Sequence, residues 1–287
     1  MKKILVLTDF SPLAKIVVSY AIGLAKILEA RIILVSVINA GSSTNTLNNW
    51  RKLEEEMIKG AQEDADRLIK KVKKEADNVQ LTYECILGFP MAEVVDGFAV
   101  KNKVDFIVMG TRGASGLLKV IVGSNATAVI NRSSIPVIVV PGKARFKKIR
   151  KVVYATDLQN LEKEIITATQ FARSFDAPLD VLHVRMASSN DQIEELDRNM
   201  ARATKENRLI KTANYPKIQF HELSSENISD AVDKFVNDQK ADFLIMFTHR
   251  LLFYEKLFGK SVTREQAFHS KVPMLTFNKT NLTNLKM

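Results

Sequence analysis

The stretch from Gly110 to Ser124 holds the residues whose types and spacing point most directly to chemistry. Gly110 and Gly113 allow a sharp turn and a close approach of the backbone to a ligand, because they carry no Cβ. Gly123 and Ser124 begin a helical pattern, and the unpaired amides and positive dipole end of a helix favour a phosphate. Glycines that merely serve turns are the alternative, but spacing and position argue against it. The stretch is therefore predicted to bind an anion.

Asp9 is the second candidate. It stands in Thr8-Asp9-Phe10-Ser11, directly after a short apolar run. A Rossmann dinucleotide site would need the glycines of G-x-G-x-x-G at this point, so their absence excludes a dehydrogenase. The four histidines lack the close spacing of metal ligands, and no serine triad can be assembled from the sequence.

The elements that would position these residues alternate between strand and helix. Continuous apolar runs are typical of parallel strands that helices cover on both faces. The pattern predicts a doubly wound α/β domain, in which ligands bind at the carboxyl ends of the strands where the strand order switches. The predicted strands lie near residues 3–7, 32–38, 81–87, 105–109 and 137–140, and the predicted helices near 12–28, 47–76, 92–102 and 125–131.

The chain also repeats itself. Thr8-Asp9 recurs as Thr156-Asp157 at an offset of 148, and the run from Asp105 to Met109 recurs as Asp242 to Met246 at an offset of 137. Several matching blocks in the same order indicate two copies of one domain. The predicted domains are residues 1–142 and 147–280, with a short basic linker after Gly142.

The composition excludes fewer functions than the motifs do. The net charge of +10 is scattered and not interleaved with aromatic residues, which does not favour nucleic-acid binding. Cys85 is the only cysteine, so no disulfide can form within the chain. The sequence has neither a signal-peptide pattern nor a run of about 20 apolar residues. A cytoplasmic protein without a membrane span is therefore expected.

The glycine spacing resembles a known signature. Gly110-x2-Gly113-x9-Gly123-Ser124 matches the ATP-binding motif of the universal stress protein family, and the resemblance covers essentially the whole chain as two domains in tandem. It implies an adenine nucleotide alpha hydrolase-like fold that binds ATP or another adenine nucleotide, with Mg²⁺ or Mn²⁺ accompanying the nucleotide. It places Asp9 beside the ribose and any bound metal, and the backbone of Val37 beside adenine.

Two positions in the motif are open to more than one interpretation. Many members of the family carry an apolar residue after Gly-Ser, and here Asn125 could add a polar contact or weaken the fit. Arg112 could contact a phosphate or face the solvent.

The second copy departs from the motif. Gly110 aligns with Phe247, Gly113 with Arg250 and Gly123 with Lys260, so that only Ser261 survives. Side chains now occupy the space that a phosphate would need. The second domain is therefore expected to have lost nucleotide binding, although Asp157 remains.

Three functions compete at this stage. The first is a binding protein that couples nucleotide occupancy to a stress-linked protein effector. The second is a slow ATPase or a phosphotransferase, which would need a group that activates water beyond Asp9, and the sequence shows none. The third is a scaffold without a ligand, which fits the second domain better than the first. The resemblance further implies an intramolecular pseudo-dimer through the last strand of each domain, and a homodimer is an additional option.

Overall fold

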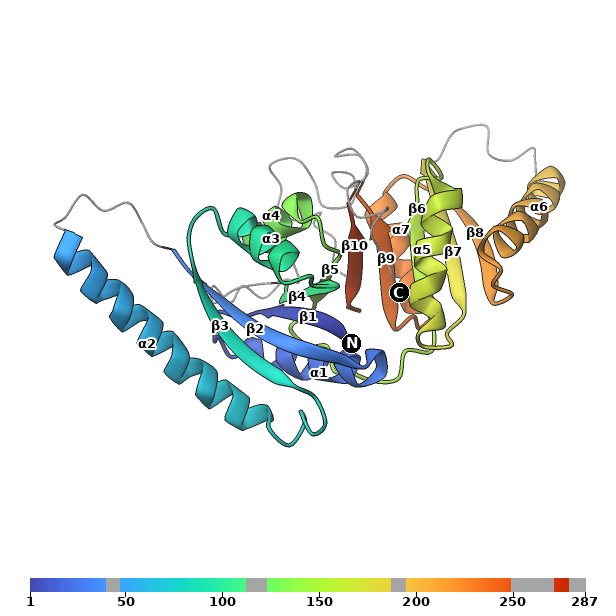
Figure 1. Ribbon diagram of the computed structural model, residues 1–287. Coiled ribbons are helices and arrows are strands. Elements are labelled where there is room, and N and C mark those ends of the chain that lie inside the picture. Colours follow the sequence, from blue (N-terminus) through green and yellow to red (C-terminus); the bar gives the residue numbers. More distant parts are fainter. Residues whose placement is uncertain (40–46, 112–122, 187–194, 249–270, 279–287) are drawn as a thin grey trace. The chain divides into compact units, whose positions relative to one another are not determined.

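The computed structural model describes residues 1–39, 47–111, 123–186, 195–248 and 271–278. The chain forms two compact units, Met1–Lys147 and Lys148–Met287 (Figure 1). Within the described stretches, no helix is both long and apolar enough to cross a membrane.

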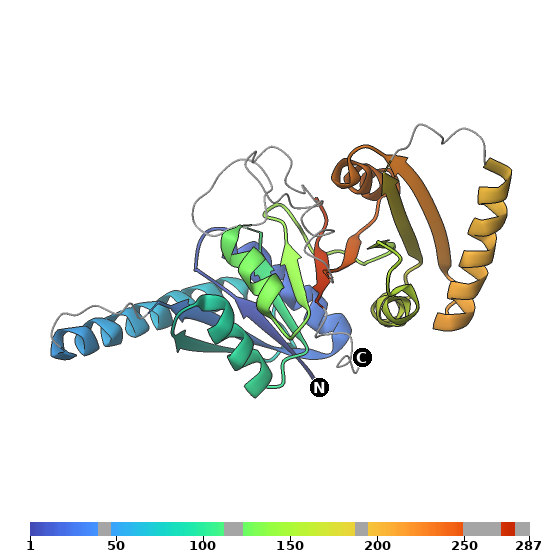
Figure 2. The same cartoon turned by 90° about the horizontal axis from the view of Figure 1, so that it is seen from above.

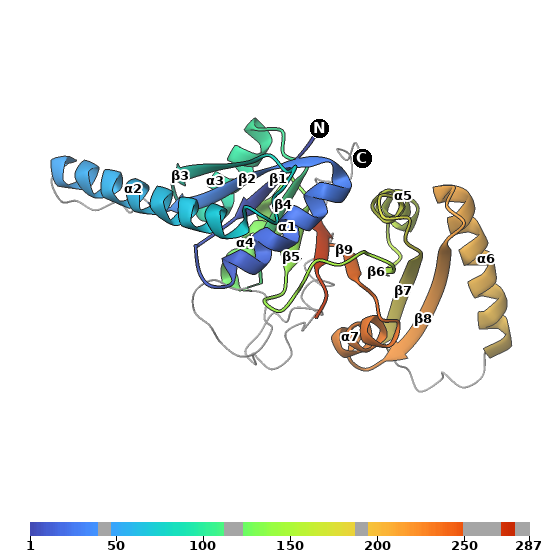
Figure 3. The same ribbon diagram turned by 90° about the horizontal axis from the view of Figure 1, so that it is seen from below.

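The first unit alternates strands and helices. Its strands are β1 (Lys2–Leu7), β2 (Ala30–Ile38), β3 (Leu81–Leu87), β4 (Phe106–Gly110) and β5 (Val137–Val140), and its helices are α1 (Ala14–Leu28), α2 (Leu47–Val72), α3 (Met91–Lys101) and α4 (Ser124–Arg132). The strands are parallel and lie in the order β3-β2-β1-β4-β5. Helices α1 and α2 pack together on one face and α3 and α4 on the other (Figure 3). The doubly wound α/β fold is therefore confirmed.

The second unit has the same design. Its strands are β6 (Val152–Thr156), β7 (Leu179–Met186), β8 (Ile218–Ser225), β9 (Phe243–Phe247) and β10 (Met274–Phe277), and its helices are α5 (Leu161–Arg173), α6 (Glu195–Ala213) and α7 (Ile228–Asp238). The strand order is β10-β9-β6-β7-β8, which corresponds to that of the first unit. Helices α5 and α6 pack together, and α7 lies against β7 and β8 from the other face (Figure 2).

The two repeats share unusual backbone conformations as well as topology. Eight non-glycine residues of the described chain have positive φ, a conformation that is uncommon for residues with a side chain. They fall into four equivalent pairs: Phe10 and Leu158, Glu29 and Asp176, Asn78 and Asn214, and Lys103 and Lys240. The turns are therefore repeated in detail, even where the side chains differ.

Burial explains the apolar strands. In β1, Ile4, Leu5 and Val6 have no exposed surface, because helices cover both sides of the central strands. Strand β3 lies at the edge, and each of its residues is exposed or only partly buried. Among the largest fully buried side chains, the second unit contributes more aromatic residues than the first. Tyr154 and Phe277 are two of them.

The segment predicted as the linker packs against the first unit. Phe146 packs edge-on against Tyr20 of α1, with ring centroids 5.3 Å apart. A Cβ on Gly23 would lie 2.1 Å from the Phe146 ring, so this glycine is required for the ring to dock on the helix. The end of the first unit is thereby attached to α1.

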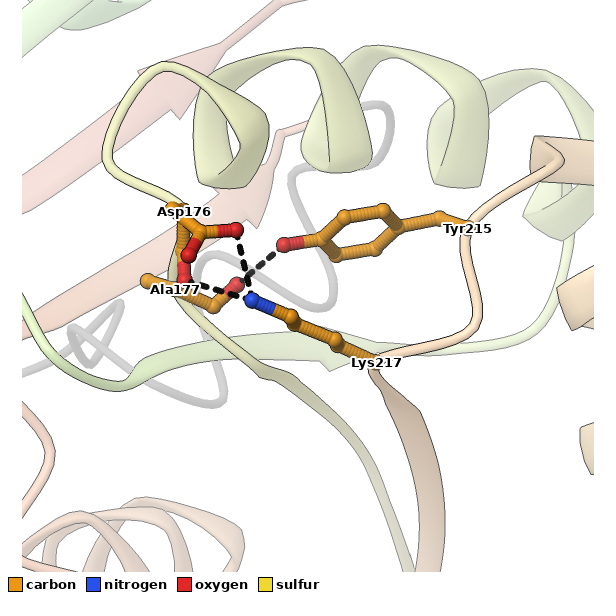
Figure 4. A network of polar contacts seen from close by, with 4 residues as sticks. All are labelled: Asp176, Ala177, Tyr215 and Lys217. Atoms are coloured by element: carbon orange, nitrogen blue, oxygen red, sulfur yellow. Dashed lines mark hydrogen bonds and ion pairs between the residues drawn. The ribbon is translucent and has the colours of Figure 1, made fainter.

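A polar network connects two loops of the second unit (Figure 4). The Tyr215 hydroxyl donates to the carbonyl of Ala177 at 2.7 Å, and Lys217 Nζ pairs with the Asp176 carboxylate at 2.5 Å. Arg173 lies 4.9 Å from the centre of the Tyr215 ring. The network holds the loop before β8 against the loop before β7, at the amino-terminal ends of the strands.

Candidate functional site

The candidate site lies in the first unit where the strand order switches. Strand β1 is flanked by β2 and β4, and the chain continues from these strands in opposite directions along the sheet. Such a switch leaves a crevice at the carboxyl ends of the strands. A cavity of about 790 Å³ occupies this place, a volume suited to a small organic ligand. Six predicted site residues line it: Asp9, Val37, Gly110, Gly123, Ser124 and Asn125.

The turn after β1 has a defined hydrogen-bond pattern. Thr8 Oγ1 accepts from the amide of Phe10 at 3.0 Å, and Asp9 Oδ1 accepts from the amide of Ser11 at 3.0 Å. Phe10 adopts a left-handed conformation with φ of 57°. The Ser11 hydroxyl is buried and has no hydrogen-bond partner in the described structure. A buried hydroxyl in this state leaves a donor and an acceptor for a ligand or water.

Val37 presents its backbone to the cavity. The amide of Thr8 donates to the carbonyl of Val35 at 2.9 Å, so Val35 faces β1. Backbone groups two residues apart in a strand face the same side, and Val37 therefore also faces the β1 side. Because the register pairs Leu7 with Val35, β1 ends before it reaches Val37. The amide and carbonyl of Val37 consequently meet the cavity rather than a neighbouring strand.

The start of α4 lies at the position where the phosphate cradle is predicted. The first helical hydrogen bond runs from the amide of Thr127 to the carbonyl of Gly123, so the amides of Ser124, Asn125 and Ala126 have no partner within the helix. All three residues line the cavity. The Gly123 amide donates to the carbonyl of Thr111 at 2.6 Å and so connects the start of α4 with the end of β4. Gly123 is thus bonded to Thr111, while the three amides that follow it have no partner within the helix.

Arg112 and Gly113 lie outside the described residues, so their roles stay predictions. Gly110 ends β4 opposite Val140 of β5 and lines the cavity.

The structure adds residues that sequence reasoning missed. Helix α2 contributes Met57, Gly60, Ala61 and Asp64 to the cavity, and Met91 lines it from α3. The apolar periodicity of a helix does not distinguish a residue that faces a cavity from one that faces the core. A glycine in the interior of a helix was the one available signal, because glycine disfavours that position.

Tyr83 supports the same wall from β3. Its hydroxyl shares a hydrogen bond of 2.6 Å with Ser36 Oγ, and its ring lies 6.0 Å from that of Phe10. Burial raises the pKa of the Tyr83 hydroxyl to about 12, although the hydrogen bond with Ser36 acts in the opposite direction. Tyr83 therefore stays neutral at physiological pH and helps to fix Phe10, which lines the cavity.

The described lining is acidic. Asp9 and Asp64 are its charged side chains, and no lysine, arginine or histidine is among the described residues of the wall. Among the described residues, no group of three or more His, Cys, Asp or Glu side chains could hold a metal ion. Amides and the dipole of α4 are thus the described groups that favour an anion.

The equivalent edge of the second unit keeps the turn. Thr156 Oγ1 accepts from the amide of Leu158 at 3.0 Å, and Asp157 Oδ1 accepts from the amide of Gln159 at 3.1 Å. These bonds repeat the pattern around Asp9, and Leu158 shares the positive φ of Phe10.

The same edge differs at the position of Gly110. The register pairs Phe247 with Phe277, as it pairs Gly110 with Val140 in the first unit. The rings of Phe247 and Phe277 stack with centroids 4.7 Å apart, and Tyr154 meets Phe247 edge-on at 5.4 Å. Aromatic side chains therefore fill the end of this strand. Arg250, Lys260 and Ser261 lie outside the described residues.

A buried hydroxyl anchors this cluster. The Tyr154 hydroxyl donates to Glu164 of α5, and both side chains are almost completely buried. Burial and the neighbouring Glu164 carboxylate raise the pKa of Tyr154 well above its ordinary value. Tyr154 occupies the position of Val6 in the register of the first unit, so the second core contains a polar pair where the first is apolar.

Fold and site together define a class of protein: a doubly wound α/β domain with a helix amino terminus at the switch in strand order. Comparison with known proteins specifies the family. The family model described as "Universal stress protein family" matches residues 1–141 and again residues 148–278. The chain therefore belongs to the universal stress protein family, in a tandem arrangement.

Individual relatives agree with this assignment. The chain is 36% identical to Universal stress protein MJ0531 of Methanocaldococcus jannaschii over 143 residues, which cover 48% of this chain and 81% of that protein. It is 30% identical to Universal stress protein MJ0577 of the same organism over 156 residues, covering 50% and 96% of the two chains. The crystal structure of a universal stress protein from Archaeoglobus fulgidus matches 96% of this chain and 98% of its own, with a TM-score of 0.65. At 18% identity that match shows a shared fold.

Proposed function

We propose that the first domain, residues 1–142, binds ATP or another adenine nucleotide, and that the second domain, residues 147–280, does not. One observation carries the proposal. Six residues of the motif and its surroundings, from four separate stretches of the sequence, line a single cavity of about 790 Å³ at the switch point. Adenine is proposed as the base because the glycine spacing resembles the ATP-binding motif of the universal stress protein family.

Each group has a role in this proposal. The amides of Ser124 and Asn125 at the start of α4 hold the phosphates, because their donors are not used within the helix. The exposed Asp9 carboxylate binds the ribose hydroxyls, and the backbone of Val37 binds the edge of the base. The buried Ser11 hydroxyl supplies a further donor or acceptor.

A divalent cation would enter together with the nucleotide. Mg²⁺ or Mn²⁺ would be held by phosphate oxygens with Asp9 nearby, because the described residues do not form a metal site by themselves. The cation would neutralise phosphate charge in a cavity whose described charged side chains are both acidic.

The biological role proposed is coupling rather than catalysis. Occupancy of the site would shift the conformation of the first domain, and a stress-linked protein effector would recognise the bound form. The two domains would form a pseudo-dimer within one chain through their last strands. A cytoplasmic location stays a prediction.

Turnover is expected to be slow or absent. Within the described cavity wall, Asp9 and Asp64 are the titratable side chains, and no histidine or lysine stands beside them to activate water. An ATPase or phosphotransferase is the alternative function. Phosphate release at the roughly 1–10³ per second of ordinary enzymes, abolished by Asp9→Ala, would favour that alternative.

Isothermal titration calorimetry tests the proposal. Purified protein should bind ATP, ADP or AMP in the presence of Mg²⁺ or Mn²⁺, with GTP as the matched control for the base. No heat of binding with any adenine nucleotide at about 1 mM, a concentration that detects affinities near −4 kcal/mol, would overturn it.

A further inference from the structure

We propose that helix α2 forms the wall that binds the nucleoside part of the ligand, and that Gly60 keeps this wall open. The inference rests on the proposed function and extends it to a segment outside the phosphate-binding motif. It concerns Met57, Gly60, Ala61 and Asp64, all of which line the cavity.

The topology places α2 at the end of the cavity away from the phosphates. The cradle follows β4, on one side of β1, whereas β2 lies on the other side of β1. Helix α2 follows β2 in the chain and packs against β2 and β3. A ligand whose phosphates lie at the start of α4 therefore directs its sugar and base toward β2 and α2.

One face of α2 serves both the core and the cavity. Ala65, Leu68 and Val72 are buried, whereas Met57, about two turns before Ala65 along the same stripe, is 41% exposed. The amino-terminal half of the helix extends past the strands (Figure 3). The apolar stripe thus passes from the packed core into the wall of the cavity.

Gly60 is not required by packing within the protein. A Cβ built at this position meets no atom within 4 Å. Glycine disfavours a helix interior relative to alanine, so this residue weakens α2 without relieving a contact. A ligand in the cavity would fill the empty space beside Gly60. Gly97 of α3 also has open space around it, but it does not line the cavity.

The chemistry of the wall favours a nucleoside over a phosphate. Met57, Gly60 and Ala61 present a small apolar surface, and the polarizable sulfur of methionine packs well on aromatic rings. The Asp64 carboxylate, which Arg67 binds from one turn further along, accepts hydrogen bonds from hydroxyl or amino groups and repels phosphate. The face therefore suits a purine ring with its ribose hydroxyls.

Two matched leucine variants test the inference. Gly60→Leu projects a side chain into the cavity, and Gly97→Leu makes the same change in a helix outside it. Both variants should fold, because leucine is the better helix former; thermal unfolding followed by circular dichroism checks this. Binding of ATP, ADP and AMP is measured by calorimetry for both variants and for the unmodified protein. Gly60→Leu is expected to weaken all three nucleotides at least about tenfold and by a similar factor, with a smaller loss for Gly60→Ala, whereas Gly97→Leu leaves them unchanged.

The outcomes separate this inference from the proposed function. If the unmodified protein binds ATP, and the Gly60→Leu and Gly97→Leu variants bind it with the same affinity, the inference is wrong and the proposed function stands. If the loss decreases as phosphates are removed, α2 faces the phosphates and the inference is again wrong. If the unmodified protein binds none of the nucleotides, the proposed function fails and the inference with it.

Discussion

The two repeats keep the same turn after the first strand and differ in what fills the space above it. In both, a threonine hydroxyl and an aspartate carboxylate accept amides two residues along the chain, and the residue after the aspartate has positive φ. The retained Asp157 shows that an aspartate at this position has a structural role in the turn. Asp9 alone is therefore weak evidence for a nucleotide.

The strands that end beside this turn, β4 in the first unit and β9 in the second, show a clearer difference between the repeats. Gly110 leaves the end of β4 open to a cavity, whereas Phe247 at the same register position stacks on Phe277. A ring in this place gives the second unit a continuous aromatic core. The second unit therefore buries an aromatic ring at the position where the first unit has a cavity.

Exchanging these two residues should produce the largest effects. Gly110→Phe places a ring in the cavity and is expected to weaken nucleotide binding by more than about 100-fold, or about 2.7 kcal/mol. Phe247→Gly removes a buried ring and should destabilise the second unit by about 3–5 kcal/mol. It should not create a nucleotide site, because Arg250 and Lys260 remain. Calorimetry and urea unfolding measure the two effects; nucleotide binding by the second domain of Phe247→Gly would contradict the comparison.

A buried ionic cluster is expected to give the second unit a pH dependence that the first lacks at this position. Asp180 is 1% exposed and lies 3.1 Å from Lys151 Nζ and 3.4 Å from His221 Nε2, whereas the equivalent residue of the first unit is Ile33. Burial alone would raise the pKa of Asp180, but His221 and Lys151 together hold it below its ordinary value.

The sign of the pH effect follows from this shift. A carboxyl whose pKa is lower in the folded state than its unfolded value of about 3.9 stabilises the fold above that pH, and the contribution is lost as the pH falls through the folded pKa. Asp180→Asn should therefore cost the second unit about 1–3 kcal/mol at pH 7, and less as the pH falls below about 4. Hydrogen exchange in β7 at pH 7 and pH 3.5, with β2 as the internal control, measures this. An equal cost at both pH values would show that the carboxylate charge is not responsible.

The smallest expected effect concerns the shared turn. Asp9→Ala and Asp157→Ala each remove one hydrogen bond to an amide, and each should reduce the free energy of unfolding of its unit by about 1 kcal/mol. Asp9→Ala should also weaken the nucleotide about tenfold or more, through loss of a charged hydrogen bond. Asp157→Ala should leave binding unchanged. Equal effects of the two variants on binding would remove the distinction between the repeats.

Much of this arrangement was predictable from sequence. The alternation of elements and the matching blocks gave the fold and the two repeats, because apolar runs and short turns are local signals. The glycine spacing led to the cavity end of β4 and the start of α4. The hydrogen bond from the Gly123 amide to the Thr111 carbonyl was not predictable, because it joins residues that are far apart in the sequence.

The contributions of α2 and β3 were missed for a different reason. Gly60 and Asp64 reach the wall of the site, and Tyr83 supports that wall, only through packing of elements that follow β2. Their helical or strand periodicity is the same whether they face a ligand or the core. Likewise, the sequence shows a bulky residue at position 247. Its stacking with Phe277 could not be predicted, because it depends on the strand register.

The most direct test of the whole account is the number of nucleotides bound per chain. Calorimetric titration with ATP, combined with mass spectrometry of the complex under native conditions, should give one nucleotide per chain. Gly123→Asp, which places a carboxylate in the cradle, should reduce this to none, and Lys260→Ala in the second domain should leave it at one. Two nucleotides per chain, or full binding by Gly123→Asp, would contradict the claim that the first repeat alone binds the ligand.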